Sequence, residues 1–124
     1  MNRQRTLIWL LLLFLLLSAC SSGATRPTSP TADGERLFAI WCSGCHALDP
    51  AAPVALGPTM AGVATRAAAN ADGLSPEAWL RRELLQPNAV ISPGYNAGLM
   101  PSSYAESLRP EQIDALISFM LTLE

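Results

Sequence analysis

Residues 41–46 read Trp-Cys-Ser-Gly-Cys-His, and this stretch decides how the rest of the chain is interpreted. It contains the pattern C-x-x-C-H, in which Cys42 and Cys45 are followed directly by His46. Two thiols at this spacing near the end of a helix reach the vinyl groups on one edge of a porphyrin, and the adjacent imidazole then faces the iron. The pattern predicts one haem c, attached through Cys42 and Cys45, with His46 as an iron ligand.

Three other sites use similar residues. A zinc site needs four ligands, and apart from Cys20 the chain offers only two Cys and one His. A thioredoxin-like dithiol protein shares the W-C-x-x-C pattern, but there the motif follows a buried strand rich in β-branched residues. Residues 33–41 have the apolar spacing of a short amphipathic helix instead. A disulfide between Cys42 and Cys45 leaves His46 unexplained, so haem attachment is the favoured interpretation.

The second iron ligand is predicted by elimination. The chain has one His and no Lys, so a soft Met sulfur is the donor left for the other side of the iron. Met120 lies in the apolar pattern of a C-terminal helix, and Met60 follows His46 by only 14 residues. Met100 comes 54 residues after His46, in a segment where prolines and glycines favour a stiff loop with tight turns. Met100 is therefore the predicted ligand.

The N-terminus has the pattern of an export signal. Arg3 and Arg5 precede an apolar run over residues 7–17, which is shorter than the roughly 20 residues that a membrane-spanning helix needs. The run ends in Leu-Ser-Ala-Cys at residues 17–20, which resembles the lipobox of bacterial lipoproteins. A signal peptide over residues 1–19 and a lipid on Cys20 are predicted. An ordinary signal peptide with a chance Cys, or a short uncleaved anchor, are the alternatives.

The rest of the chain divides into a tether and one domain. Residues 21–32 are small and polar with two prolines, which is typical of a flexible linker, and residues 33–124 have room for one small domain. The predicted mature chain has six Arg against ten acidic residues, a net charge of −4. This balance excludes a basic nucleic-acid-binding protein, and the length excludes a two-domain enzyme. The signal peptide and the lipobox together predict an exported bacterial protein. We expect it to be lipid-anchored on the outer face of the cytoplasmic membrane or in the periplasm.

Over residues 33–124 the chain resembles a class I, monohaem cytochrome c. The resemblance rests on motifs in a fixed order, which are Gly34-Glu35-Arg36-Leu37-Phe38, then residues 42–46, Leu56-Gly57-Pro58, Gly62-Val63 with Arg66, Met100-Pro101, and a closing helix with Leu116 and Phe119. The resemblance implies an all-α fold of about four helices with long loops around one haem. Start signals at Ser75-Pro76 and at Pro110 agree with two of these helices.

The resemblance also implies roles for single residues. In the family, the carbonyl group at the position of Pro58 accepts a hydrogen bond from Nδ1 of the iron-binding His, here His46, which orients the ring. A residue at the position of Arg66 often pairs with a haem propionate, although a solvated surface Arg is an equal alternative. Trp79 is expected in the core, with a hydrogen bond to the other propionate as the alternative.

These residues predict an electron carrier and not an enzyme. With His46 and Met100 on the two sides of the iron, no position is open for a small-molecule substrate. A membrane-tethered carrier serving a respiratory or photosynthetic chain, with redox proteins as partners, is the first interpretation. A fixed haem subunit of a quinol-oxidising complex, an oxidase or a dehydrogenase is the second. A haem sensor or peroxidase, which needs Met100 to dissociate, and a dithiol protein are less favoured.

Overall fold

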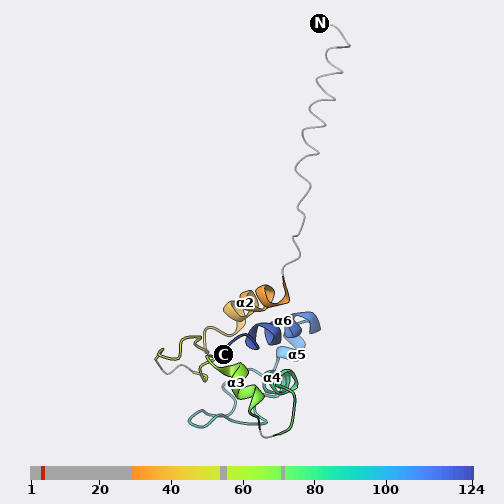
Figure 1. The fold of residues 1–124 in the computed structure, drawn as a ribbon. Coiled ribbons are helices and arrows are strands. Elements are labelled where there is room, and N and C mark those ends of the chain that lie inside the picture. Colours follow the sequence, from red (N-terminus) through yellow and green to blue (C-terminus); the bar gives the residue numbers. More distant parts are fainter. Residues whose placement is uncertain (1–3, 5–28, 54–55, 71) are drawn as a thin grey trace.

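The computed structural model describes residues 4, 29–53, 56–70 and 72–124. These residues form helices and loops without a strand, which confirms the all-α prediction (Figure 1). The five helices are α2 (Pro30–Trp41), α3 (Val63–Ala68), α4 (Pro76–Leu85), α5 (Tyr104–Ser107) and α6 (Pro110–Met120). The expectation was about four helices with long loops, which this arrangement fits. The predicted signal peptide and Cys20 lie outside the described residues.

Helix α2 begins earlier than predicted. The hydroxyl oxygen of Ser29 accepts a hydrogen bond from the Ala32 backbone N–H at 3.2 Å, and Pro30 occupies the first turn. A Ser N-cap followed by Pro is a favourable helix start, because Pro lacks the N–H that this position leaves unpaired. Residues 30–32, which the sequence analysis assigned to the tether, form the first residues of α2.

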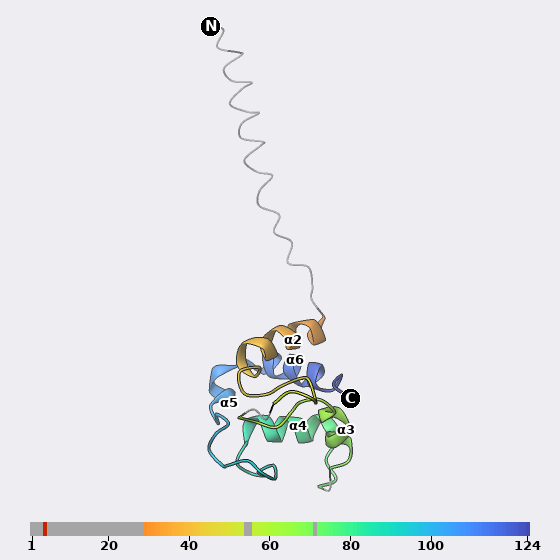
Figure 2. The same ribbon diagram turned by 90° about the vertical axis from the view of Figure 1, so that its left-hand side faces the viewer.

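Helices α2 and α6 make the most extensive helix contact, lying one above the other in both views (Figures 1 and 2). At Gly34 the two helices approach closely. A Cβ atom at Gly34 would lie 2.7 Å from the Ala115 carbonyl carbon and 2.7 Å from Cβ of Phe119. Four residues further along α2, the Phe38 ring packs against the Phe119 ring with centroids 5.5 Å apart. These contacts join the motif of residues 34–38 to the closing helix that carries Phe119.

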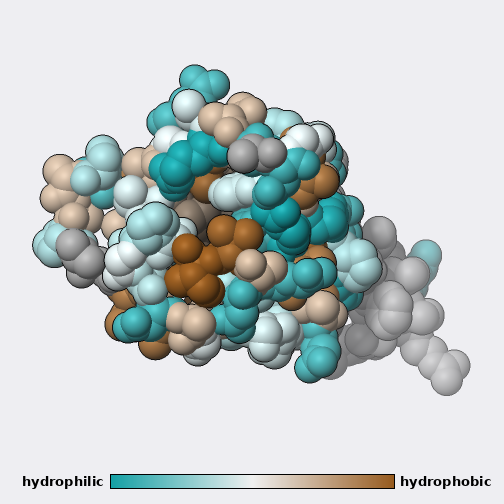
Figure 3. Space-filling model, turned by 90° about the horizontal axis from the view of Figure 1, so that it is seen from below, coloured by the Kyte–Doolittle hydropathy of each residue, from teal (hydrophilic) through white to brown (hydrophobic). Residues whose placement is uncertain are grey.

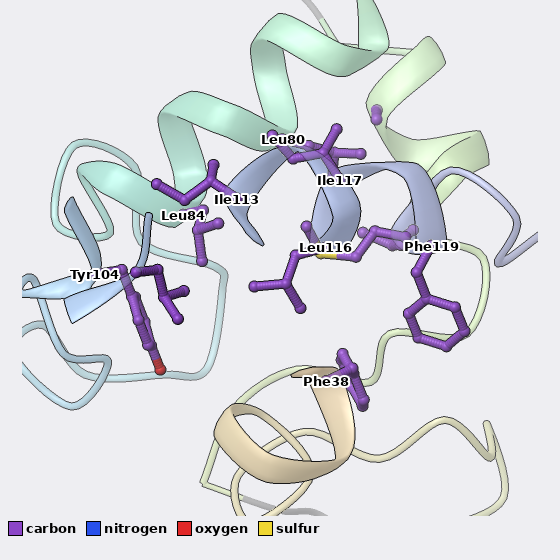
Figure 4. Close-up of a cluster of buried hydrophobic side chains, with 12 residues drawn as sticks. Phe38, Leu80, Leu84, Tyr104, Ile113, Leu116, Ile117 and Phe119 are labelled. Atoms are coloured by element: carbon purple, nitrogen blue, oxygen red, sulfur yellow. The ribbon is translucent and has the colours of Figure 1, made fainter. Parts of the chain in front are cut away.

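The hydrophobic core is built around α6 (Figure 4). Phe38, Leu116 and Ile117 are its most completely buried large side chains. The core cluster also contains further side chains of α6, side chains from α3, α4 and α5, and Leu108 directly after α5, namely Val63, Ala67, Leu80, Leu84, Tyr104, Leu108, Ile113, Phe119 and Met120. Burial of a side chain of this kind stabilises the fold by about 1.5–3 kcal/mol. Met120 is a core residue, as predicted.

Helix α4 has the predicted limits. The Ser75 hydroxyl oxygen accepts from the Ala78 N–H at 3.2 Å, and the helix ends at Leu85, two residues before Pro87. An ion pair of 2.6 Å between Arg81 and Asp114 joins α4 to α6 at the surface. After α4 the chain runs through a long loop, residues 86–103, before α5 begins. Within the described residues, no helix combines the length and the apolar character that crossing a membrane requires.

Candidate functional site

One pocket collects the residues that the sequence predicts for the site. It lies between α2 and α6 on one side and α4 with the loops on the other, and its space measures about 1380 Å³, including the part open to solvent. Its lining includes Cys42, Cys45, His46, Pro58, Arg66 and Met100. Most other lining residues are apolar, and Figure 3 shows a hollow on the lower face with hydrophobic residues gathered beside it.

The end of α2 presents both thiols to this pocket. The Cys42 N–H closes α2 by donating to the Phe38 carbonyl at 2.9 Å. The Cys42 carbonyl then accepts from the N–H groups of Cys45 at 3.0 Å and His46 at 2.9 Å, so one tight turn holds all three side chains. Both thiols are free and partly buried. The disulfide alternative is therefore not what the structure contains.

The acidity of Cys42 bears on the dithiol alternative. Burial, with a further contribution from the charge of Cys45, raises the pKa of the Cys42 thiol from 9.0 to about 11. The attacking cysteine of a dithiol oxidoreductase instead has a lowered pKa, because the thiolate is the reactive form. This environment keeps Cys42 protonated at neutral pH and does not favour thiol–disulfide exchange.

The His46 ring is oriented from two directions. Its Nδ1 atom lies 2.8 Å from the Pro58 carbonyl oxygen. A carbonyl only accepts, so Nδ1 carries the proton and Nε2 keeps its lone pair for a metal. Gly57 packs against the same ring, since a Cβ atom there would lie 2.8 Å from Nδ1 and 2.9 Å from Nε2. The sequence places Gly57 before Pro58, but its contact with the imidazole comes from the structure.

Three methionines line the pocket. Met120 belongs to the core, and Met60 is held by its backbone, with its N–H donating to the Ala47 carbonyl at 2.8 Å. Met60 follows Pro58 by two residues, so it belongs to the chain segment that orients His46. Met100 reaches the pocket from the separate loop of residues 86–103. Ligation of iron by Met100 stays a prediction.

Arg66 has backbone partners in this structure. Its guanidinium donates to the carbonyl oxygens of Thr59 and Ala61, each at 2.6 Å, from the last turn of α3. Arg66 therefore braces the segment after Pro58 at the wall of the pocket, and its pairing with a propionate stays a prediction. Trp79 is half-buried, packs against the core and also lines the pocket, which agrees with its expected core position.

Tyr104 is a pocket residue that no sequence pattern singles out. Its ring is buried, its hydroxyl donates to the Trp41 carbonyl at 3.4 Å, and the two rings meet edge to face with centroids 6.4 Å apart. Burial raises the pKa of Tyr104, and the charges of Cys42 and Cys45 raise it further. Tyr104 therefore stays neutral and joins the start of α5 to the end of α2, 63 residues earlier.

The comparison with protein families agrees with this site. The family model described as cytochrome c matches residues 31–124, which is most of the chain. The chain belongs to the cytochrome c family. Cytochrome c proteins carry covalently bound haem c, and the spacing of Cys42 and Cys45 fits this attachment. The match begins beside Pro30, where α2 starts. No curated protein matches the chain.

The pocket fits the haem that a cytochrome c carries. Two free thiols stand at its wall, the imidazole is held with Nε2 available, and the lining is mostly apolar, as a porphyrin requires. The absent Cβ of Gly57 leaves the space in which the imidazole lies. Within the described residues, no group of three or more His, Cys, Asp or Glu side chains could hold a metal ion by itself.

Proposed function

We propose that this protein is a class I, monohaem cytochrome c that carries single electrons outside the cytoplasm and is tethered to a membrane. The observation that carries the proposal is the pocket in which His46, oriented through Pro58 and Gly57, shares the lining with Met100. The bound haem supplies an iron that gains or loses one electron. Ligation by His46 and Met100 leaves no position on it for a substrate, and a Met ligand raises its potential.

The surrounding residues serve this function by limiting rearrangement. The Pro58 carbonyl holds the imidazole in one orientation, and the absence of a side chain at Gly57 leaves room for the ring there. The apolar wall keeps water from the iron, which favours a stable pair of ligands. An electron carrier needs this rigidity because little should move when the charge of the centre changes by one.

The first test replaces the two candidate methionines. Met100→Leu is expected to remove the far-red absorption band of Met-ligated ferric haem and to let carbon monoxide bind the reduced protein. The matched variant Met60→Leu, in the same pocket, is expected to keep the far-red band. Its reduced form is expected not to bind carbon monoxide. Absorption spectra of the oxidised and reduced holoproteins measure both effects. Carbon monoxide binding by the unmutated protein would instead support a sensor or a peroxidase.

The mouth of the pocket indicates what kind of partner the carrier meets. Four of the large exposed apolar side chains also line the pocket, namely Trp41, Leu56, Val90 and Leu99. The segments that contribute Leu56, Val90 and Leu99 carry no charge, since residues 50–65 and 84–105 contain no Asp, Glu, Lys or Arg, and the charged residues of the lining are Arg66 and Glu83. A redox partner with an apolar, uncharged contact face fits this mouth. A strongly basic partner face would find no acidic groups in these two segments.

A charge introduced at the mouth is expected to slow electron exchange. Leu99 is 52% exposed there, so in Leu99→Glu two copies in contact bring like charges together. A repulsion of about 1 kcal/mol in water makes electron self-exchange at low salt about fivefold slower, and added salt restores the rate. Line broadening in mixtures of oxidised and reduced protein measures the rate by NMR.

The control for this variant carries the same charge elsewhere. Leu74 is 36% exposed and does not line the pocket, so Leu74→Glu is expected to keep the exchange rate nearly unchanged. Equal slowing in both variants would mean that net charge, and not the mouth, controls the encounter.

The membrane tether is proposed from the sequence. Lipid on Cys20 would leave nine residues before α2 begins at Pro30, a reach of at most about 32 Å, which confines the pocket near its partners. Cys20→Ser is expected to release the exported holoprotein from the membrane fraction, while Ser21→Ala leaves it bound. Cell fractionation with detection of covalent haem measures this, and a Cys20→Ser protein that stays in the membrane would disprove the lipid anchor.

A further inference from the structure

The loop that carries Met100 is closed by one side chain. Residues 86–103 contain local turns, in which Ala89 N–H donates to the Gln86 carbonyl at 2.9 Å and Tyr95 N–H to the Ser92 carbonyl at 3.1 Å. Across the loop, the Asn88 side-chain oxygen accepts from the Gly98 N–H at 2.7 Å. Among the hydrogen bonds of the described residues, this is the one that joins the two limbs of the loop.

We propose that Asn88 is a positioning residue that holds Met100 on the iron. The inference rests on the proposed His46/Met100 ligation. Gly98 lies two residues before Met100 and has a φ of 78°, a left-handed conformation that favours glycine. The bond from Gly98 to Asn88 fixes the backbone at this point, and Pro101 stiffens the chain on the other side of Met100. The side chain of Met100 therefore approaches the pocket from a closed loop.

Asn88 acts at a distance from the pocket itself. It is exposed and is not among the residues that line the pocket, so it exerts its effect through Gly98. Loss of the hydrogen bond opens a loop whose limbs are otherwise held by local turns. The expected consequence is a larger fraction of molecules in which Met100 has left the iron, while the folded domain keeps its core.

The chain offers a matched control in Asn70. Its side chain also bridges a loop, between α3 and α4, by donating to the carbonyl oxygens of Leu74 at 2.9 Å and Ala67 at 2.6 Å. Its oxygen accepts from the N–H groups of Leu74 at 3.3 Å and Asp72 at 3.1 Å, so it makes more bonds than Asn88 does. Asn70 does not line the pocket either. A variant at Asn70 therefore reports the general effect of opening a surface loop, without a direct link to Met100.

The experiment titrates the ferric holoprotein with imidazole, which binds the iron only where Met100 has left. The apparent dissociation constant for imidazole is inversely proportional to the fraction of molecules in which Met100 has left the iron. Asn88→Ala is expected to lower it about fivefold, the factor that one hydrogen bond of ordinary net strength supplies, and to weaken the far-red Met band. Asn88→Asp, which keeps an oxygen acceptor of the same reach, is expected to restore the original value. Asn70→Ala is expected to leave it unchanged.

The outcomes separate this inference from the function on which it rests. If the unmutated protein lacks the far-red band, the His46/Met100 ligation fails and the inference fails with it. If the unmutated protein shows the band and Asn88→Ala binds imidazole with the original affinity, only the role of Asn88 is overturned. Equal gains in affinity for Asn88→Ala and Asn70→Ala would also overturn it, since the effect would then follow from general loosening.

Discussion

Gly57→Ala is expected to release His46 from its position. The backbone at Gly57 has no positive φ, so alanine is strained only by its contact with the ring, where its Cβ atom would lie 2.8 Å from Nδ1. The ring must move, and its hydrogen bond to Pro58 is then broken. Groups that orient a metal ligand typically contribute 10–100-fold to metal binding, so the population without His46 on the iron rises by about that factor. Electron paramagnetic resonance measures the high-spin ferric iron that results.

The control for Gly57→Ala lies in the haem-binding motif itself. A Cβ atom at Gly44 would meet no atom within 4 Å, so Gly44→Ala is expected to keep a low-spin spectrum. A low-spin Gly57→Ala protein with the original ratio of haem to protein would show that the ring has space to shift, and would refute this account of Gly57.

Gly34→Ala is expected to destabilise the domain by about 3 kcal/mol or more. The added methyl group would fall 2.7 Å from the Ala115 carbonyl carbon, and this atom belongs to the backbone of α6 and does not move aside. Overpacking of a core commonly costs about 1–3 kcal/mol, and here two helices must separate while Phe38 and Phe119 lose their contact. The melting temperature of the holoprotein is expected to fall by more than about 12 °C.

A loss of stability in Gly34→Ala would be opposite to the usual effect of replacing glycine by alanine in a helix. On an exposed helix position, alanine is favoured over glycine by about 1 kcal/mol, so only a steric conflict makes Gly34→Ala harmful. Ala39 is exposed on the same helix, and Ala39→Leu adds more volume there. This variant is expected to keep the melting temperature within a few degrees. A Gly34→Ala protein as stable as the unmutated protein would mean that α2 and α6 adjust their crossing at little cost.

Local patterns in the sequence predicted the starts of α4 and α6, and the start of α2 was missed for a clear reason. Ser75-Pro76 was recognised as a helix start, and α4 begins there. Ser29-Pro30 has the same signal and the same N-cap bond, but it lies in a stretch of small polar residues that resembles a linker. The N-cap bond and Pro30 decide the start of α2, whereas the composition of the surrounding residues favours a linker.

The sequence by itself determined the cofactor and its covalent attachment, because C-x-x-C-H places three chemically specific groups within five consecutive residues. For the second ligand it predicts a methionine, because the chain has no Lys and no second His. Only the tertiary structure decided which residues serve that site from elsewhere in the chain. The sequence marked Gly57 only as part of Leu56-Gly57-Pro58 and did not mark Asn88, because the contact of Gly57 with the imidazole and the bond of Asn88 across the Met100 loop depend on how the chain folds back on itself.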